Sequence, residues 1–193
     1  MSSLGTFFWR NTLARMDQRL VVPIIGPDAV VIEGEDGHRP FTEYLARWVE
    51  HDLGLPAGKE PASDLNEVAC RFLQEPGATR EDLYITVREA LDKNPVKPPE
   101  ALRKLARIKA FNLYVTTGID DLLCKAIDDA RFGGRRRTEV IAYAPQKVGD
   151  LSPALSSLAY PVVYHLHGRA SLEPDYVVTE EDLLEFLHSL QAS

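Results

Sequence analysis

Three short segments of the sequence hold side chains that could carry out chemistry, and each follows an apolar run typical of a strand. The first is residues 26–28, the second is residues 116–121, and the third contains His165 and His167. In open α/β sheets, ligands bind beyond the carboxyl ends of the strands. The three segments are therefore predicted to meet at one edge of a sheet.

The first segment begins like a phosphate-binding loop and then changes its chemistry. An apolar strand at residues 20–25 leads to Gly26, the place where nucleotide-binding α/β proteins put a glycine-rich turn. Pro27 has no N–H to offer a phosphate, and Asp28 brings a negative charge. Gly26 and Asp28 thus mark a cofactor loop whose residues do not suit a diphosphate.

The second segment offers hydroxyl groups and a carboxylate where a strand meets a helix. Thr116 and Thr117 are followed by Gly118 and then by Asp120 and Asp121. These side chains could hydrogen-bond a ribose. Alternatively, the carboxylates only stabilise the first helical turn, by a few tenths to about 1 kcal/mol.

The two histidines of the third segment alternate along a strand and so point to opposite faces. His167, directly before Gly168 at the strand's carboxyl end, is a candidate general base. The alternative is a packed or solvated side chain without a catalytic role. His165 is expected to be structural.

Composition excludes several classes of protein. The 193-residue chain has a net charge of −7, whereas a general nucleic-acid binder needs a basic surface. Cys70 and Cys124 are far apart and form no Cys-x-x-Cys pair, so neither a zinc ribbon nor another metal site is expected. No apolar run approaches the about 18 residues of a membrane span. We expect a cytoplasmic protein with no nucleic-acid or membrane partner.

The remaining sequence predicts the elements that position these segments. Their order is helix, strand, helices, strand, helix, strand, strand and helix, which indicates an α/β fold with a mostly parallel, Rossmann-like sheet. A hairpin is expected shortly after Gly26, and a helical insertion at about residues 42–110. We expect one domain over residues 1–193, forming the N-terminal part of a longer protein.

Several helix starts can be predicted from capping residues. Thr42 is expected to cap the first inserted helix, and Ser63 or Asp64 the next. Thr179 and Asp182 have the spacing of a capping box before the last helix.

The order of these motifs resembles that of the sirtuin-like family, in particular its zinc-free bacterial members in anti-phage and other NAD-depleting immune proteins. The segment TTGIDDLLCKAI is similar to the family's Thr-Thr-Asn-x-Asp-x-Leu-Leu motif, and VVYHLHG to its Leu-His-Gly strand end. DYVVTEEDLLEFL is similar to the helix that follows. The resemblance covers roughly residues 18–190 and implies NAD as a ligand or substrate, without a metal.

The resemblance also implies a role for each matching residue. His167 corresponds to the catalytic histidine, which acts on the nicotinamide-side ribose hydroxyl of NAD. Asp120 corresponds to the aspartate of the motif, and Thr116 and Thr117 to its hydroxyl-bearing positions.

Two departures from the family pattern affect the NAD site. The family's Gly-Ala-Gly-x-Ser loop would occupy residues 26–30, where only Gly26 matches: Asp28 replaces the second glycine and Val30 the serine. At about 4 Å and an effective dielectric of about 20, a carboxylate beside a phosphate costs about 4 kcal/mol. Gly118 replaces the asparagine that orients the ribose and a water.

These departures favour a regulatory or assembly module of a bacterial immune protein, with weakened or lost NAD hydrolysis. Its partners would be other domains of a longer chain or a second copy. One alternative is an active NAD hydrolase that forms ADP-ribose and nicotinamide with His167 as the base. Another is a sensor of NAD or ADP-ribose. In the favoured interpretation, the hairpin fills the space of the lost dinucleotide.

Overall fold

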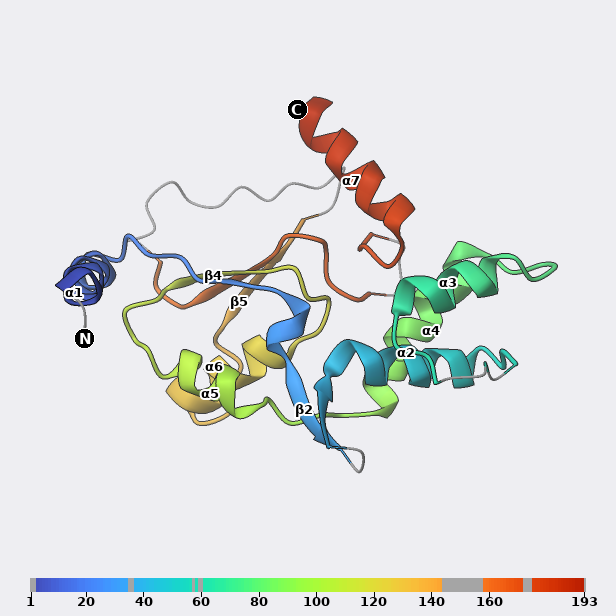
Figure 1. The fold of residues 1–193 in the computed structure, drawn as a ribbon, viewed down its shortest axis with the longest axis horizontal. Helices are drawn as coiled ribbons and strands as arrows, with labels where there is room; N and C mark the ends of the chain where they lie inside the picture. The colour runs from blue at the N-terminus through green and yellow to red at the C-terminus, as the bar shows by residue number, and fades with distance from the viewer. Residues whose placement is uncertain are drawn as a thin grey trace.

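A four-stranded parallel sheet forms the centre of the fold in the computed structural model, which describes residues 3–34, 37–56, 58, 61–143, 158–171 and 175–192. The strands follow the order β1 (Ile24–Ile25), β4 (Leu113–Thr116), β6 (Val162–His165) and β5 (Glu139–Ala142). Helices surround this sheet (Figure 1), and the predicted α/β, Rossmann-like fold is confirmed.

The other elements follow the predicted order. A 3-10 turn, η1 (Pro27–Ala29), follows β1 and leads into the antiparallel hairpin of β2 (Val31–Gly34) and β3 (Gly37–Pro40), which confirms the predicted hairpin. The α-helices are α1 (Ser3–Asp17), α2 (Phe41–Asp52), α3 (Leu65–Leu73), α4 (Arg80–Lys93), α5 (Glu100–Ala106), α6 (Leu122–Phe132) and α7 (Glu180–Ala192).

The central strands β4 and β6 are apolar because both their faces are covered, as is usual in parallel sheets. Tyr114 of β4 and Val163 of β6 have no exposed surface and belong to one cluster with Leu102 of α5 and Ile127 of α6. Helices α5 and α6 lie together along one side of the sheet (Figure 1). This packing fixes the carboxyl ends of the strands relative to α6.

Helices α2, α3 and α4 occupy the place predicted for a helical insertion and form a group beside the sheet (Figure 1). Their buried face includes Leu45, Val68 and Leu83. Tyr176 and Val178, from the segment before α7, belong to the same cluster. The insertion is therefore joined to the end of the chain through its core.

Two of the predicted caps are confirmed. The Asp64 carboxylate accepts a hydrogen bond from the Asn66 N–H at 2.9 Å at the start of α3. At the start of α7, the Asp182 N–H donates to Thr179 Oγ1 at 3.2 Å and the Thr179 N–H donates to Asp182 Oδ2 at 2.7 Å. This is the reciprocal pattern of a capping box.

Two predicted boundaries are wrong. Thr42 does not cap α2, because the helix begins one residue earlier and the Phe41 N–H donates to the Val30 carbonyl at 2.7 Å across the hairpin. The strand predicted at residues 20–25 is reduced to Ile24–Ile25. Pro23 has no N–H for the ladder, so it contributes only its carbonyl, which accepts from the Val115 N–H at 3.0 Å.

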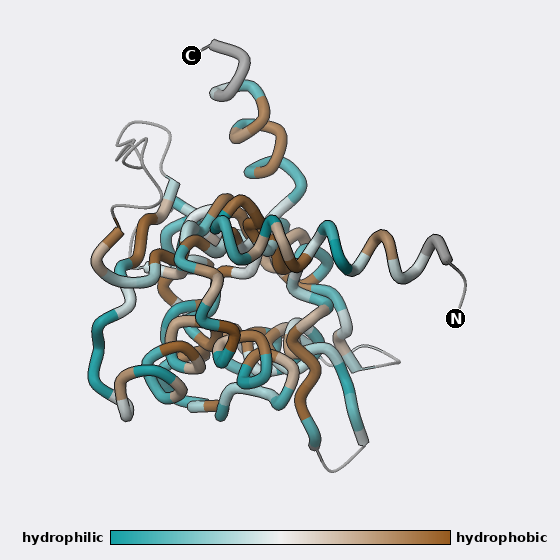
Figure 2. The backbone as a smooth tube through the Cα atoms, turned by 90° about the vertical axis from the view of Figure 1, so that its left-hand side faces the viewer, coloured by the Kyte–Doolittle hydropathy of each residue, from teal (hydrophilic) through white to brown (hydrophobic). Residues whose placement is uncertain are grey.

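Helix α1 and the C-terminal part of α7 project from the body of the molecule, as Figures 1 and 2 both show. In α1, Phe7, Phe8 and Trp9 are each about 60% exposed. Among the described helices, none combines the length and apolar character that a membrane span requires.

Candidate functional site

A cavity of about 380 Å³ lies at the carboxyl ends of β1 and β4. It is lined by η1, the loop after β4, the starts of α2 and α3, and residues 177–178. Its polar lining side chains are Asp28, Thr42, Ser63, Asp64, Asn66, Thr117 and Asp120. The volume is typical of a small-molecule site, for which about 300–1,000 Å³ is usual. The described part of the hairpin therefore does not fill this space, contrary to our expectation.

The structure brings four of the predicted site residues to this cavity: Asp28, Thr117, Gly118 and Asp120. Thr116 is buried beside them, and its hydroxyl accepts a hydrogen bond from the Gly118 N–H at 3.0 Å. Thr116 thus shapes the loop that carries the lining residues, and its hydroxyl is already engaged.

Gly26 does not line the cavity, and the turn that it begins has few free donors. The Ala29 N–H donates to the Gly26 carbonyl at 3.1 Å, and the Val30 N–H donates to the Pro27 carbonyl at 3.0 Å. A phosphate-binding loop presents such N–H groups to its ligand. Here they are consumed within η1, and Pro27 has none.

Asp120 both caps the start of α6 and lines the cavity. One carboxylate oxygen accepts a hydrogen bond from the Leu122 N–H at 2.8 Å and so closes the first turn of α6. The same side chain lines the cavity. Burial, joined by the charge of Asp121, raises the pKa of Asp120 above its ordinary value of 3.8. A Cβ at Gly118 would lie 3.1 Å from Asp120 Oδ2, so glycine leaves this carboxylate free to face the cavity.

The charges around the cavity have one sign. Asp28, Asp64 and Asp120 line it, and the described lining contains no lysine, arginine or histidine. Carboxylates and hydroxyls suit the hydroxyl groups of a sugar or a cationic ligand. A diphosphate would instead meet repulsion without a compensating cation.

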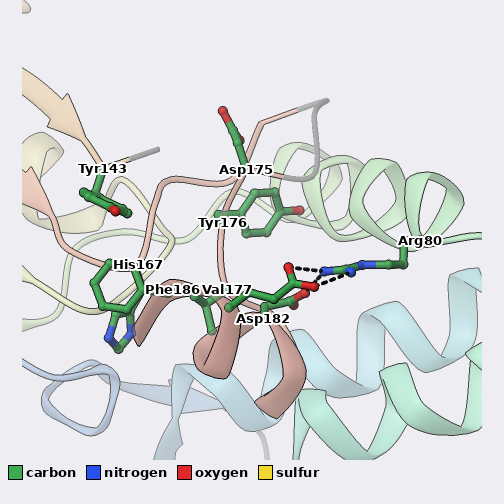
Figure 3. Close-up of a pocket in the computed structure, with 9 residues that line it drawn as sticks. Arg80, Tyr143, His167, Asp175, Tyr176, Val177, Asp182 and Phe186 are labelled. Carbon is green, nitrogen blue, oxygen red and sulfur yellow. Dashed lines mark hydrogen bonds and ion pairs between the residues drawn. The ribbon is translucent and has the colours of Figure 1, made fainter. Parts of the chain in front are cut away.

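His167 lies in a separate, smaller hollow of about 50 Å³ (Figure 3). Tyr143 and Phe186 line the same hollow, and the His167 ring packs edge-on against Phe186 with the ring centres 5.4 Å apart. Burial lowers the pKa of His167, so the imidazole is neutral at pH 7. The candidate base therefore does not line the cavity that holds Asp120 and Thr117, and Val177 is the one described residue that lines both hollows.

Some lining residues were not predicted as site residues from the sequence. Ser63 and Asp64 were considered only as caps, and Asn66 was not singled out. The side of the hollow opposite His167 contains the ion pair between Arg80 of α4 and Asp182 of α7 (Figure 3). No local pattern identifies these contacts, because Arg80 and Asp182 are brought together only by the packing of α7 on the insertion.

Replacing Asp120 with asparagine is expected to raise the free energy of unfolding at pH 7. An asparagine oxygen can still accept from the Leu122 N–H, while the cost of a buried charge is removed. Because the folded-state pKa of Asp120 is raised, wild type loses stability as the pH rises above about 3.8. The stability advantage of Asp120→Asn over wild type should therefore increase above this pH and disappear below it. Urea unfolding at several pH values measures this.

The adjacent substitution Asp121→Asn is the matched control, with the opposite sign. Burial alone would raise the pKa of Asp121, but the hydrogen bonds and charge of Arg169 outweigh burial and lower it. Asp121→Asn should therefore destabilise the protein at pH 7, and this loss should shrink as the pH falls below about 3.8. Equal changes in the free energy of unfolding for the two substitutions would contradict the opposite pKa shifts of Asp120 and Asp121.

No protein-family model matches this chain, and a search of curated proteins finds no significant match to it. The function must therefore be argued from the residues and the geometry of the site.

Proposed function

We propose that this chain is a sirtuin-like domain that has lost NAD hydrolysis and serves as a regulatory or assembly module of a bacterial immune protein. The observation that carries this proposal is the separation of His167 from the cavity that holds Thr117 and Asp120. A general base must come within about 2.6–3.2 Å of the proton that it removes, directly or through one water. A ribose in the cavity would contact Thr117 and Asp120 but not His167, which does not line it.

The cavity's own chemistry also argues against a bound dinucleotide. Asp28 replaces a glycine of the family pattern, and the N–H groups of Ala29 and Val30 are used within the turn. The hollow beside His167, at about 50 Å³, is far below the about 300 Å³ of small ligand sites. An active NAD hydrolase with His167 as the base would have to bring His167 to the cavity and rebuild the diphosphate loop.

A second candidate function is the sensing of a small nucleoside-type ligand without turnover. It is favoured by the volume of the large cavity and by the hydroxyl and carboxylate groups of Thr117 and Asp120. A ligand with one phosphate or none would avoid most of the repulsion from Asp28. Such a sensor would report to an attached domain or to a second copy.

Calorimetric titration with NAD, ADP-ribose and adenosine, with product analysis of the same mixtures, separates these functions. We expect no nicotinamide release and no binding of NAD tighter than millimolar. Binding of a nucleoside without turnover would favour the sensor. Nicotinamide release that disappears in His167→Ala would overturn the proposal and establish a hydrolase.

Replacing Asp28 with asparagine is expected to strengthen ADP-ribose binding about tenfold at low salt. The Coulomb cost of about 4 kcal/mol for a close pair is reduced here because Asp28 is exposed and screened by solvent, which leaves about 1.4 kcal/mol. Asp129→Asn is the matched control, since it removes the same charge from an exposed position of α6. An equal gain in both variants would mean that only net charge matters.

A further inference from the structure

A second cluster of chemically capable side chains lies outside the cavity, where the start of α6 meets the end of β6. Asp121, Cys124 and His165 each place one potential ligand atom there, and these atoms all lie within 4.8 Å of one another. Asp121 and Cys124 are three residues apart, so they share one face of α6. His165 is the last residue of β6.

The hydrogen bonding of His165 leaves a bare lone pair directed into the protein. Its Nδ1 lies 3.0 Å from the Gly118 carbonyl oxygen. A carbonyl can only accept, so Nδ1 carries the proton and Nε2 does not. The side chain has no exposed surface, and Nε2 has no hydrogen-bond partner among the described residues. A buried acceptor left without a partner destabilises the fold, which indicates that a partner is missing.

We propose that Asp121, Cys124 and His165 bind a divalent transition-metal ion, with Zn²⁺ as the preferred ion. For three atoms that all lie within 4.8 Å of one another, there is always a point no more than about 2.8 Å from each, and zinc bonds to these ligand types are about 2.0–2.3 Å long. Small side-chain movements therefore close the site. A set of one nitrogen, one sulfur and one oxygen favours zinc over magnesium or calcium.

The charges balance in both states of this site. Without metal, Asp121 is paired with Arg169, whose Nε and Nη2 lie 2.6 and 2.7 Å from the two carboxylate oxygens. Burial raises the pKa of Cys124 to about 12, so this thiol is neutral. On binding, the thiol S–H bond breaks, its proton passes to solvent, and a metal–sulfur bond forms. The dication then neutralises the thiolate and the carboxylate together, which releases Arg169.

Arg169 is thus a competitor that holds the site closed in the absence of metal. Its side chain is 39% exposed, so it can turn into solvent without leaving a buried charge. This inference is independent of the function proposed above, because the three ligands do not include His167 or any group required for NAD binding.

Titration of the whole chain with Co²⁺, a spectroscopic substitute for zinc, tests the proposal under reducing conditions. We expect a thiolate-to-cobalt charge-transfer band and visible ligand-field bands that Zn²⁺ abolishes. Cys124→Ser should lose the charge-transfer band, whereas Cys70→Ser, which changes an exposed cysteine on α3, should retain it. A band that depends on Cys70, or no band in the wild-type chain and in the Arg169 variant described next, would overturn the proposal.

The Co²⁺ affinity of Arg169→Gln distinguishes a competitor of the metal from an ion pair that only stabilises the fold. Removing the competitor is expected to tighten Co²⁺ binding at least tenfold, while Asp121→Asn should weaken it by a similar factor. If Arg169→Gln does not fold, the comparison of wild type, Cys124→Ser and Cys70→Ser decides the question. Unchanged or weaker cobalt binding in a folded Arg169→Gln protein would show that Arg169 does not guard a metal site.

Discussion

Replacing Gly168 with alanine is expected to lower the free energy of unfolding by about 3 kcal/mol or more. Gly168 has φ of +78°, a conformation that costs an L-residue about 1–2 kcal/mol. An added Cβ would lie 2.5 Å from the Asp175 carbonyl oxygen and 2.6 Å from the Tyr176 Cα. These are main-chain atoms that cannot rotate away, so overpacking adds about 1–3 kcal/mol. Urea denaturation followed by circular dichroism measures the change.

Two other glycines separate the two causes. Gly133 ends α6 with φ of +61°, but a Cβ there would meet nothing within 4 Å, so Gly133→Ala should cost only about 1 kcal/mol. Gly26 has a negative φ, and an added Cβ there would meet nothing within 4 Å. The free energy of unfolding of Gly26→Ala should therefore stay within about 0.5 kcal/mol of the wild-type value. If Gly168→Ala lowers the free energy of unfolding no more than Gly133→Ala does, residues 175–176 do not approach Gly168 as closely as the structure has them.

The same contacts explain why Gly168 matters for the site. The Val177 N–H donates to the His167 carbonyl at 2.8 Å, and the Ala170 N–H donates to the Ile119 carbonyl at 3.0 Å. The chain on both sides of Gly168 is thereby fixed, together with Val177, which lines both hollows. Because Gly168 has no side chain, residues 175–176 can pack closely enough to place Val177.

Local rules predicted the elements of this fold well, because their signals lie within a few residues. The caps at Asp64 and Thr179 depend only on their own helices, and alternating apolar and turn residues marked the hairpin. The two errors had different causes, one a hydrogen bond across the hairpin and the other a proline within the predicted strand. Phe41 is satisfied by Val30 across the hairpin rather than by a Thr42 cap, and Pro23 reduces β1 to two residues.

The site could be predicted only in part for a related reason. Parallel strands place their carboxyl ends together, so Asp28, Thr117 and Asp120 were expected to meet, and they do. The absence of His167 from this cavity could not be predicted, because it depends on how residues 175–178 pack on the helical insertion. The unpartnered Nε2 of His165 could not be predicted either, because it depends on the hydrogen bond between Nδ1 and the Gly118 carbonyl, which is distant in the sequence.

Replacing Arg131 with alanine is expected to cost about 3 kcal/mol, because this side chain binds the corner where α5 passes into β4. Its guanidinium donates to the carbonyls of Ala106, Ile108 and Phe111 at 2.7, 2.6 and 2.9 Å. It also donates to the Tyr114 hydroxyl and stacks on that ring, 5.7 Å from its centre. Truncation leaves these acceptors with at best partial access to water, and hydrogen bonds to a charged group are worth about 1.5–3 kcal/mol each.

Arg131→Lys should restore less than half of this loss, because an ammonium group cannot reproduce the planar fork that reaches three carbonyls at once. Arg136→Ala removes an equal charge from an exposed position and should change stability by less than about 0.5 kcal/mol. Full rescue by lysine would mean that charge alone matters. Arg131 fixes the start of β4, and Thr117 and Gly118 follow the end of the same strand. A loss in both Arg131→Ala and Arg131→Lys, but not in Arg136→Ala, would therefore show that the planar guanidinium and its three carbonyl acceptors stabilise the segment between α5 and β4.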